Sequence, residues 1–519
     1  MKNVLFPFLA ILAWFQLVHA QLEWSSPPAV ISNTGVDASD QEIAIDPNGN
    51  GVAVWVENGY IISSYLSFGG SWSSTSTLSS SGASAPQVAF DSGGNATAIW
   101  VESGVIQSST LPFGGSWSST PDVLSSTGAS SPQLAVDGDG NAVAIWVRGD
   151  NIESNSKLSG GSWNDSPDVF DGPGASSPQV AINGGNVVAV WHSPVDSTNM
   201  VSSTSKAIGG AWNTVQLVSW SFLNSAFAKV AVDPSGNAVA TWFSYNLSGD
   251  DFSSVALQSA SLPIGGYWTS PVYISSYGIM NPANLVSYIS LDGNGDGVAV
   301  WTMSYDGSLL NVESSTLPFG GYWTYVVEVN PTDPYAYDCN VDVVSIPPAL
   351  ALYMMKSTGI SIQAVYKDID SFDGIWSSPA TISVDTYNAY PRIDASLLDN
   401  TLNAIAVWTG WDGSNTNVQA VTISKEILQP PTGLAVSQTT NDLNVLTEYQ
   451  NVVTWDASAL IDVVGYNIYR GDVFLGAVSS TDTLQFTDYN RTLGAMDSYG
   501  VSSVDAYGSE SSQAIITLM

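Results

Sequence analysis

Residues Ser131–Trp163 read SPQLAVDGDGNAVAIWVRGDNIESNSKLSGGSW, and this stretch decides the fold of most of the chain. Two short apolar runs, Gln133–Val136 and Ala142–Val147, flank the sequence DGDGN, which is typical of a tight hairpin. A third run, Ile152–Leu158, alternates with polar residues, and a fourth begins near Trp163 after a glycine pair. The stretch therefore predicts four antiparallel strands.

This four-strand unit recurs along the chain at intervals of about 45 residues, somewhat longer in the later copies. The tryptophan of its second strand recurs at Trp55, Trp100, Trp146, Trp191, Trp242, Trp301 and Trp408, and Tyr353 is expected to take that place in one degenerate copy. The tryptophan that follows the glycine pair recurs at Trp72, Trp117, Trp163, Trp212, Trp268 and Trp323, with Trp376 in a related sequence. Four-stranded propeller blades have this period, whereas solenoids repeat at shorter intervals.

The number of strands predicts how the repeat array closes. Eight copies of the first three strands are present, the last at Pro391–Ser396, Ala404–Thr409 and Val418–Ser424, but only seven fourth strands follow them. The segment Glu23–Ser32 resembles a fourth strand and precedes any first strand. We therefore predict an all-β fold with an eight-bladed β-propeller closed by the N-terminal strand, which removes open sheet edges. Seven blades is the alternative if the copy around Tyr353 is incomplete.

The ends of the chain differ from the repeats. Met1–Ala20 has a lysine, an apolar core and a small-residue cleavage site, and so predicts a signal peptide and a secreted, periplasmic or cell-surface protein. No other stretch is long and apolar enough to predict a transmembrane segment. The predicted division is a signal peptide at residues 1–20, a propeller at 21–426 and a third region at 427–519.

Composition limits the chemistry. Without Lys2 the chain has ten basic and 46 acidic residues, which argues against nucleic acid and anionic membranes as partners. Cys339 and His192 stand alone after export, so we expect no intrachain disulfide framework, no multi-histidine zinc site, no Ser-His-Asp triad repeated across the blades and no cofactor. His192 is expected at the surface. Asp46–Glu57 fits a calcium-loop pattern, but the following strand would carry Glu57 away, and hairpin chemistry explains the turn.

The strand order predicts two faces with different roles. The first strand should line the central channel, so the aspartate hairpins and the LPFGG-like turns should share one face. The hairpins between second and third strands and the crossings between blades should form the other face, which varies in sequence, as binding loops on a rigid scaffold do. Aromatic rings beside carboxylates suit a glycan or an extracellular protein. The candidate ligand-binding residues on this face are Trp220, Tyr245, Tyr277, Tyr305, Tyr335, Tyr337, Trp411 and Asp412. Alternatively, these rings only pack the longer loops together.

After Ser424 the repeat stops, and the remainder resembles a fibronectin type III domain. The matching motifs are QPPTGL at Gln429–Leu434, VTWD at Val453–Asp456, GYNIYR at Gly465–Arg470, and Leu493 six residues before Tyr499. The resemblance implies a seven-stranded sandwich that acts as a spacer or adhesive module, with the Tyr499 hydroxyl bonded back to the chain. The RGD tripeptide that starts at Arg470 is interpreted as a hairpin turn and not as an integrin ligand.

The repeat region resembles secreted bacterial β-propeller repeat proteins, and its turn VAVDPSGNAVA (residues 230–240) is similar to NHL-type repeats. Propellers include both enzymes and binding proteins, so this resemblance implies no activity. We expect a secreted or cell-surface, non-catalytic binding protein. The alternatives are a secreted glycan-processing hydrolase with two paired carboxylates, for which no residue pair is selected, and a purely structural envelope component.

Overall fold

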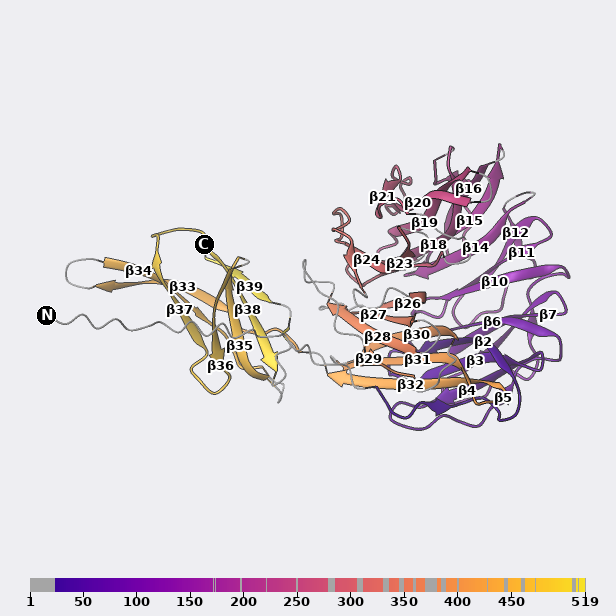
Figure 1. Cartoon of the computed structure of the whole chain (residues 1–519), viewed down its shortest axis with the longest axis horizontal. Coiled ribbons are helices and arrows are strands. Elements are labelled where there is room, and N and C mark those ends of the chain that lie inside the picture. The colour runs from indigo at the N-terminus through magenta and orange to yellow at the C-terminus, as the bar shows by residue number, and fades with distance from the viewer. Residues whose placement is uncertain are drawn as a thin grey trace. The chain divides into compact units, whose positions relative to one another are not determined.

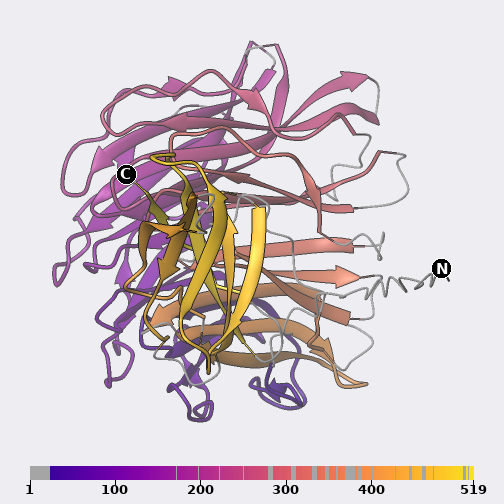
Figure 2. The same ribbon diagram turned by 90° about the vertical axis from the view of Figure 1, so that its left-hand side faces the viewer.

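The structure of the chain is a computed structural model. It describes residues 24–170, 172, 174–196, 198–220, 222–248, 251–278, 285–305, 311–329, 336–344, 350–357, 361–368, 380–383, 389–398, 401–426, 428–442, 447–458, 463–471, 473–505, 510–511 and 513–518. The predicted signal peptide, Tyr335 and Trp376 lie outside these residues. The described residues form strands and turns and no helix, as Figures 1 and 2 show, and they belong to two compact units, Leu22–Ile427 and Leu428–Met519.

In the described residues the larger unit consists of eight antiparallel four-stranded sheets, an arrangement like that of a β-propeller. The first four are β2 (Ala38–Ile45), β3 (Gly51–Glu57), β4 (Tyr60–Leu66) and β5 (Ser76–Thr77); β6 (Ala83–Phe90), β7 (Ala96–Glu102), β8 (Val105–Leu111) and β9 (Asp122–Val123); β10 (Ala129–Val136), β11 (Ala142–Arg148), β12 (Asn151–Lys157) and β13 (Asp168–Val169); and β14 (Ser176–Asn183), β15 (Asn186–Val195), β16 (Thr198–Ala207) and β17 (Gln216–Leu217). The other four are β18 (Asn224–Val232), β19 (Ala238–Ser248), β20 (Asp251–Leu262) and β21 (Val272–Tyr273); β22 (Ser287–Leu291), β23 (Gly297–Met303), β24 (Asn311–Leu317) and β25 (Val327–Glu328); β26 (Ala336–Val344), β27 (Leu350–Ser357), β28 (Ser361–Asp368) and β29 (Ala380–Thr381); and β30 (Ala389–Leu398), β31 (Thr401–Trp411) and β32 (Thr416–Glu426) with β1 (Ala29–Val30).

The last sheet contains both ends of this unit. Strand β1 pairs with β32, with Ala29 opposite Ala420 and Val30 opposite Gln419, so the predicted pairing of the N-terminal strand is confirmed. The first strands of successive sheets contact one another from β2 to β30, and β30 contacts β2. In Figure 1 the orange strands β30 to β32 accordingly lie beside the indigo strands β2 to β4. The first strands therefore form a closed ring at the centre of this unit.

A tryptophan on the second strand lies at the same register position in seven sheets. Trp55, for example, is fully buried and pairs with Ile62, the third-strand residue that pairs with Thr77 on the fourth strand. In the sheet β26–β29 that position belongs to Met355, because Met355 pairs with Gln363 and Gln363 pairs with Thr381. The prediction that Tyr353 replaces the tryptophan is therefore wrong by two residues, since the degenerate copy has no tryptophan to fix its alignment.

The aspartate hairpins and the LPFGG-like turns lie together, as predicted. Asp46 accepts hydrogen bonds from Asn50 N and Nδ2, each at 2.8 Å, and Asn50 Oδ1 accepts one from Phe68 N at 2.9 Å. The same bond from the glycine turn to the hairpin joins Phe113 to Asn95, Ser159 to Asn141, Ile264 to Asn237 and Phe319 to Asp296. We call this side of the unit the turn face. Hairpin geometry explains the turn at Asp46, and the described residues contain no cluster of metal-ligating side chains.

The described part of the unit Leu428–Met519 forms two sheets that enclose a separate core around Trp455, Tyr466 and Tyr499. One sheet contains β33 (Ala435–Asp442), β34 (Thr447–Thr454) and β37 (Gln485–Arg491), and the other β36 (Val473–Ser479), β35 (Val463–Arg470), β38 (Ser498–Asp505) and β39 (Ala514–Thr517). Aromatic and β-branched residues on the inner faces of the strands account for this core.

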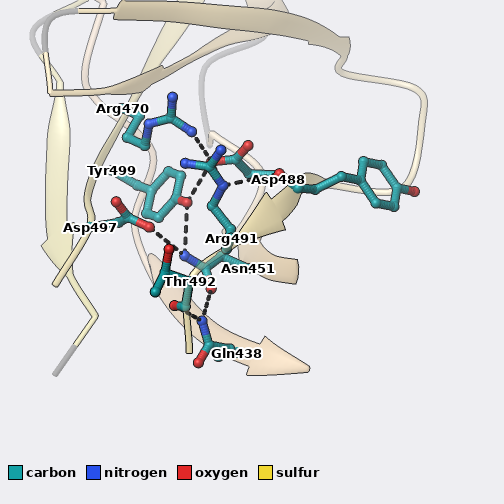
Figure 3. A network of polar contacts seen from close by, with 9 residues as sticks. Gln438, Asn451, Arg470, Asp488, Arg491, Thr492, Asp497 and Tyr499 are labelled. Carbon is teal, nitrogen blue, oxygen red and sulfur yellow. Dashed lines mark hydrogen bonds and ion pairs between the residues drawn. The ribbon is translucent and has the colours of Figure 1, made fainter. Parts of the chain in front are cut away.

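Tyr499 is the centre of a polar network in this unit, drawn in Figure 3. Its hydroxyl donates to Asp488 Oδ2 at 2.7 Å and accepts from Asn451 Nδ2 at 3.0 Å. The expected bond back to the main chain is therefore replaced by bonds to two side chains. Arg470 donates to the same Asp488 oxygen at 2.6 Å, and Arg491 lies 3.5 Å from it. Because Arg470 is held in this network, the integrin interpretation of its tripeptide gains no support; Asp472 lies outside the described residues.

Candidate functional site

The second-to-third-strand hairpins and the crossings between sheets meet on the side opposite the turn face. Ala83 N, at the end of one crossing, donates to Gly59 O in the neighbouring hairpin at 2.7 Å, and Ala129 N donates to Gly104 O at 2.9 Å. We call this side the crossing face. It contains most of the aromatic residues that the sequence selected.

Four aromatic rings, three on two successive crossings and one, Tyr273, at the end of β21 between them, form a continuous cluster on the crossing face, which we call the aromatic cluster. Trp220 stacks on Phe222 with ring centroids 5.7 Å apart, and it contacts Tyr273 edge-on at 5.3 Å. Tyr273 lies 5.3 Å from Tyr277. Phe222 and Tyr277 are 70% and 58% exposed, which is far more than packing of loops against each other requires. Burial, and hydrogen bonding to Tyr277, raise the pKa of Tyr273 to about 12, so its hydroxyl stays protonated.

The other predicted residues do not join this cluster. Tyr245 is 9% exposed and packs in the core with Leu257 and Met303. Tyr305 is 43% exposed but donates its hydroxyl to Glu313 Oε1 at 2.7 Å. Tyr337 is the second residue of β26, and its side chain, like the whole of Tyr335, lies outside what the structure describes.

Trp411 is the last residue of β31, and Asp412 follows it in the hairpin to β32, in the sheet that closes the unit. Trp411 is 39% exposed. Asp412 accepts bonds from Asn415 N at 2.7 Å and Ser414 N at 2.8 Å, which lower the pKa of its carboxyl. This aspartate therefore stabilises its own hairpin.

A belt of long polar side chains runs round the centre of the unit. Each belongs to a first strand and pairs in register with the residue just before the buried second-strand tryptophan. We call this set the axial ring; its described side chains are Glu42, Gln87, Gln133, Gln179, Lys229, Tyr288 and Arg392, and Asn340 has the same register in β26. All seven described members are half-buried, so they reach solvent.

Neighbouring members of the axial ring are in contact. Arg392 Nε donates to Glu42 Oε1 at 3.1 Å, and Lys229 Nζ donates to Gln179 Oε1 at 3.2 Å. Lys229 Nζ also lies 5.3 Å from the centre of the Tyr288 ring. Desolvation, followed by repulsion from Arg392, lowers the pKa of Lys229 to about 8, and attraction to Glu42 only partly opposes this. Lys229 and Arg392 therefore act on each other electrostatically.

A bulge with a positive φ lies two residues before six members of this ring, on the crossing-face side. Its residues are Asp40, Ala85, Ser131, Ser177, Phe227 and Tyr390, with φ between 50° and 55°. Phe227 and Tyr390, which precede Lys229 and Arg392, are 44% and 64% exposed. A bulky side chain is unfavourable in this conformation, so exposed aromatic rings here are unusual.

His192 forms a hydrogen bond with the backbone of one of these bulges. Its Nε2 accepts a hydrogen bond from Ala228 N, between Phe227 and Lys229, at 3.2 Å. It is 2% exposed, and burial lowers its pKa to about 4, so it is neutral at pH 7. The prediction of a surface histidine is wrong, because the strand continues past Trp191 to Val195 and keeps His192 inside the sheet.

Five residues of these surfaces were not predicted from the sequence: Tyr273, Phe227, Tyr390, Lys229 and Arg392. A signal for Tyr273 was present, since the equivalent fourth-strand residues Val123, Val169 and Leu217 are aliphatic. The bulge and ring residues became comparable only when the strand register was known.

A shallow groove of about 460 Å³ lies between the first two sheets, towards the turn face. Tyr65, Phe113 and Trp117 contribute to its lining together with several serine hydroxyls. It contains none of the residues that the sequence selected. No helix among the described residues is long and apolar enough to cross a membrane.

No family model matches the sequence, and no curated protein matches it significantly. Among solved structures, the chain is similar to a polysaccharide lyase described as an ulvan lyase, with 9% identity, a TM-score of 0.45 and coverage of 77% of this chain and 96% of that one. It is also similar to the Dos1 propeller, with 11% identity, a TM-score of 0.44 and coverage of 75% and 95%. A third is an α-L-arabinofuranosidase from Fusarium graminearum, with 10% identity, a TM-score of 0.36 and coverage of 65% and 92%.

Proposed function

We propose that the exported chain is a non-catalytic glycan-binding protein of the cell surface or its surroundings, and that it binds its ligand on the crossing face. In this proposal the eight sheets are the blades of one closed propeller. The unit Leu428–Met519 is a fibronectin type III-like spacer, for which its two sheets of three and four strands are suitable.

The aromatic cluster is the observation that carries this proposal. Trp220, Phe222, Tyr273 and Tyr277 present a contiguous set of ring faces and edges to solvent on a rigid sheet scaffold. Such faces stack on the apolar side of a pyranose, while hydroxyl and amide groups nearby bind the sugar hydroxyls. A protein ligand is the alternative on the same surface, because tyrosine and tryptophan are also enriched at protein interfaces.

The carboxylate beside the exposed Tyr305 makes structural hydrogen bonds. Glu313 is 5% exposed, and its two oxygens accept bonds from Trp301 Nε1 at 2.8 Å and the Tyr305 hydroxyl at 2.7 Å. Burial raises the pKa of Glu313, and these two bonds partly offset the rise. A carboxylate held in this way supports the tryptophan and is poorly placed to act as a general acid for a sugar.

The test is a glycan array probed with the exported chain, residues 21–519, and with matched variants. Trp220→Ala and Tyr277→Ala should abolish the signal for the bound glycan. Tyr322→Ala, which removes a 93% exposed ring in a turn at the other face, should leave it unchanged. No bound glycan, or equal signals from all these proteins, would contradict the proposal; cleavage of the arrayed sugars would favour the hydrolase.

A further inference from the structure

We propose that the crossing-face end of the axial ring binds the anionic group of an acidic saccharide, with Lys229 and Arg392 as its charge partners and Phe227 and Tyr390 as stacking surfaces. The inference deepens the proposed function and rests on it for the saccharide nature of the ligand. The anionic group is argued separately, from the ring and its bulges.

Two of the few positive charges of the chain lie in the axial ring. The exported chain has only ten basic residues against 46 acidic ones, yet two of the ten belong to one ring at the centre of the larger unit. Arg392 is paired with Glu42, whereas Lys229 forms no ion pair with any described carboxylate. A lysine and an arginine that repel each other inside a half-buried ring are unfavourable, and an anion between them would relieve the repulsion.

The other members of the axial ring include amides and a phenol. Gln87, Gln133 and Gln179 are equivalent residues in three successive sheets, and each has an amide that can both donate and accept. Tyr288 lies against Lys229 on the other side. Amides and a phenol beside two cations suit a ligand that combines hydroxyls with a carboxylate or sulfate, as acidic sugars do.

The type of residue at each bulge differs with the ring member that follows it. Where the ring member is glutamine, the bulge residue is Ala85, Ser131 or Ser177; where it is Lys229 or Arg392, the bulge residue is Phe227 or Tyr390. Aromatic rings in a left-handed conformation are costly and remain exposed to solvent, so core packing does not account for them. Aromatic and cation thus occur together, in two sheets, at the end of the ring that opens towards the crossing face.

The experiment is calorimetric titration of the exported chain with a panel of oligouronates and sulfated oligosaccharides. Methyl-esterified and desulfated oligomers of the same length serve as neutral controls. The acidic oligomers should bind at least about tenfold more tightly than their neutral forms. The uronate and sulfate arms identify which anion the ring prefers. If acidic and neutral forms bind equally, the inference is overturned while the proposed function stands. If no oligosaccharide of either kind binds here or on the array, both are overturned.

Substitutions test whether the preference for acidic oligomers comes from the axial ring. Lys229→Gln should bind the acidic and the neutral oligomer with nearly equal affinity. Lys157→Gln is the matched control, because Lys157 is also partly buried but donates to Thr97 and Thr110 between two sheets. Phe227→Gly and Tyr390→Gly should weaken binding of both oligomers without lowering the melting temperature, because glycine accepts the positive φ. Unchanged preference in Lys229→Gln, or equal losses in Lys157→Gln, would overturn the assignment.

Discussion

The turn face and the crossing face of the larger unit are built from equally regular backbone, but only one of them varies its side chains. On the turn face, Asp46, Asp137 and Asp233 are almost fully buried, and each binds the asparagine four residues later. Towards the crossing face, the six bulges share their φ values while their side chains range from Ala85 to Phe227. A side chain that holds a turn together is limited to residues that can make its hydrogen bonds, namely asparagine or, at Asp296, aspartate, whereas a side chain that only projects from a bulge is free to differ between sheets.

The largest expected effect is a loss of stability on substitution of Asp137, which lies on the turn face. Its carboxylate accepts bonds from Asn141 N at 2.9 Å, Asn141 Nδ2 at 3.0 Å and, in the next sheet, Gly185 N at 3.0 Å. Asp137→Ala should therefore lower the free energy of unfolding by about 4.5 kcal/mol, taking for each of the three bonds the lower limit of the roughly 1.5–3 kcal/mol that a bond to a charged acceptor contributes. Denaturant unfolding measures this change.

The matched control lies in the same turn. Asp139 is exposed, so Asp139→Ala should change stability by no more than about 0.5 kcal/mol. Equal losses in the two variants would show that the turns tolerate change and would remove the contrast between the faces.

The next largest effect is the pH dependence caused by His192. Its folded-state pKa of about 4 lies below the unfolded value of 6.5, so the folded state binds fewer protons between these limits. The stability due to neutral His192 is fully present above pH 6.5 and is lost as the pH falls to about 4. The total is about 3 kcal/mol, at 1.36 kcal/mol for each pKa unit.

Urea unfolding at several pH values tests this effect. His192→Gln lacks a titrating group, so its stability should be nearly level between pH 6.5 and 5, where few carboxylates titrate, while that of the parent chain declines. Parallel curves for the two proteins would show that His192 is not buried as a neutral base beside the Phe227 bulge.

A smaller effect on stability is expected at the bulges themselves. Ala85→Gly should stabilise the unit or leave it unchanged, within about 1 kcal/mol, because relief of the positive φ competes with the greater freedom of glycine in the unfolded chain. The melting temperature reports this, and saccharide binding should be unaffected. A change in binding for Ala85→Gly as large as that for Phe227→Gly would mean that the bulges act through their backbone and not through their aromatic rings.

The smallest effect concerns binding alone. Lys229, with a pKa of about 8, faces Arg392, Glu42 and Tyr288, and it loses its charge as the pH rises from 7 to 9. The affinity for an acidic oligosaccharide should fall roughly tenfold over this range, in proportion to the protonated fraction of Lys229. Lys229→Gln should show no such decline, and an identical decline in that variant would assign the titration to another group.

Periodicity alone predicted the four-strand unit, the shared position of the aspartate and glycine turns, and the pairing of β1 with β32. It could do so because Trp, Gly and Asp occur where the backbone requires them. The candidate site was less predictable. Trp220 and Tyr277 were found as aromatics in long crossings, but Tyr245 is in the core because its strand extends past Trp242 to Ser248.

Lys229 and Arg392 were not predicted, since they lie in different sheets far apart in the sequence. Only the register that aligns each with its buried second-strand tryptophan shows that they are equivalent. The ring also brings Arg392 against Glu42, although 350 residues separate them in the chain. A ligand site built from one residue per sheet leaves no local motif in the sequence.

The most direct test of the account is the crystal structure of residues 21–519 with the acidic oligosaccharide that binds best. We predict density for the sugar on the crossing face, with its anionic group within hydrogen-bonding distance of Lys229 and Arg392 and a ring stacked on Phe227 or Tyr390. A sugar seated on the turn face, or in the groove lined by Tyr65 and Trp117, would contradict it.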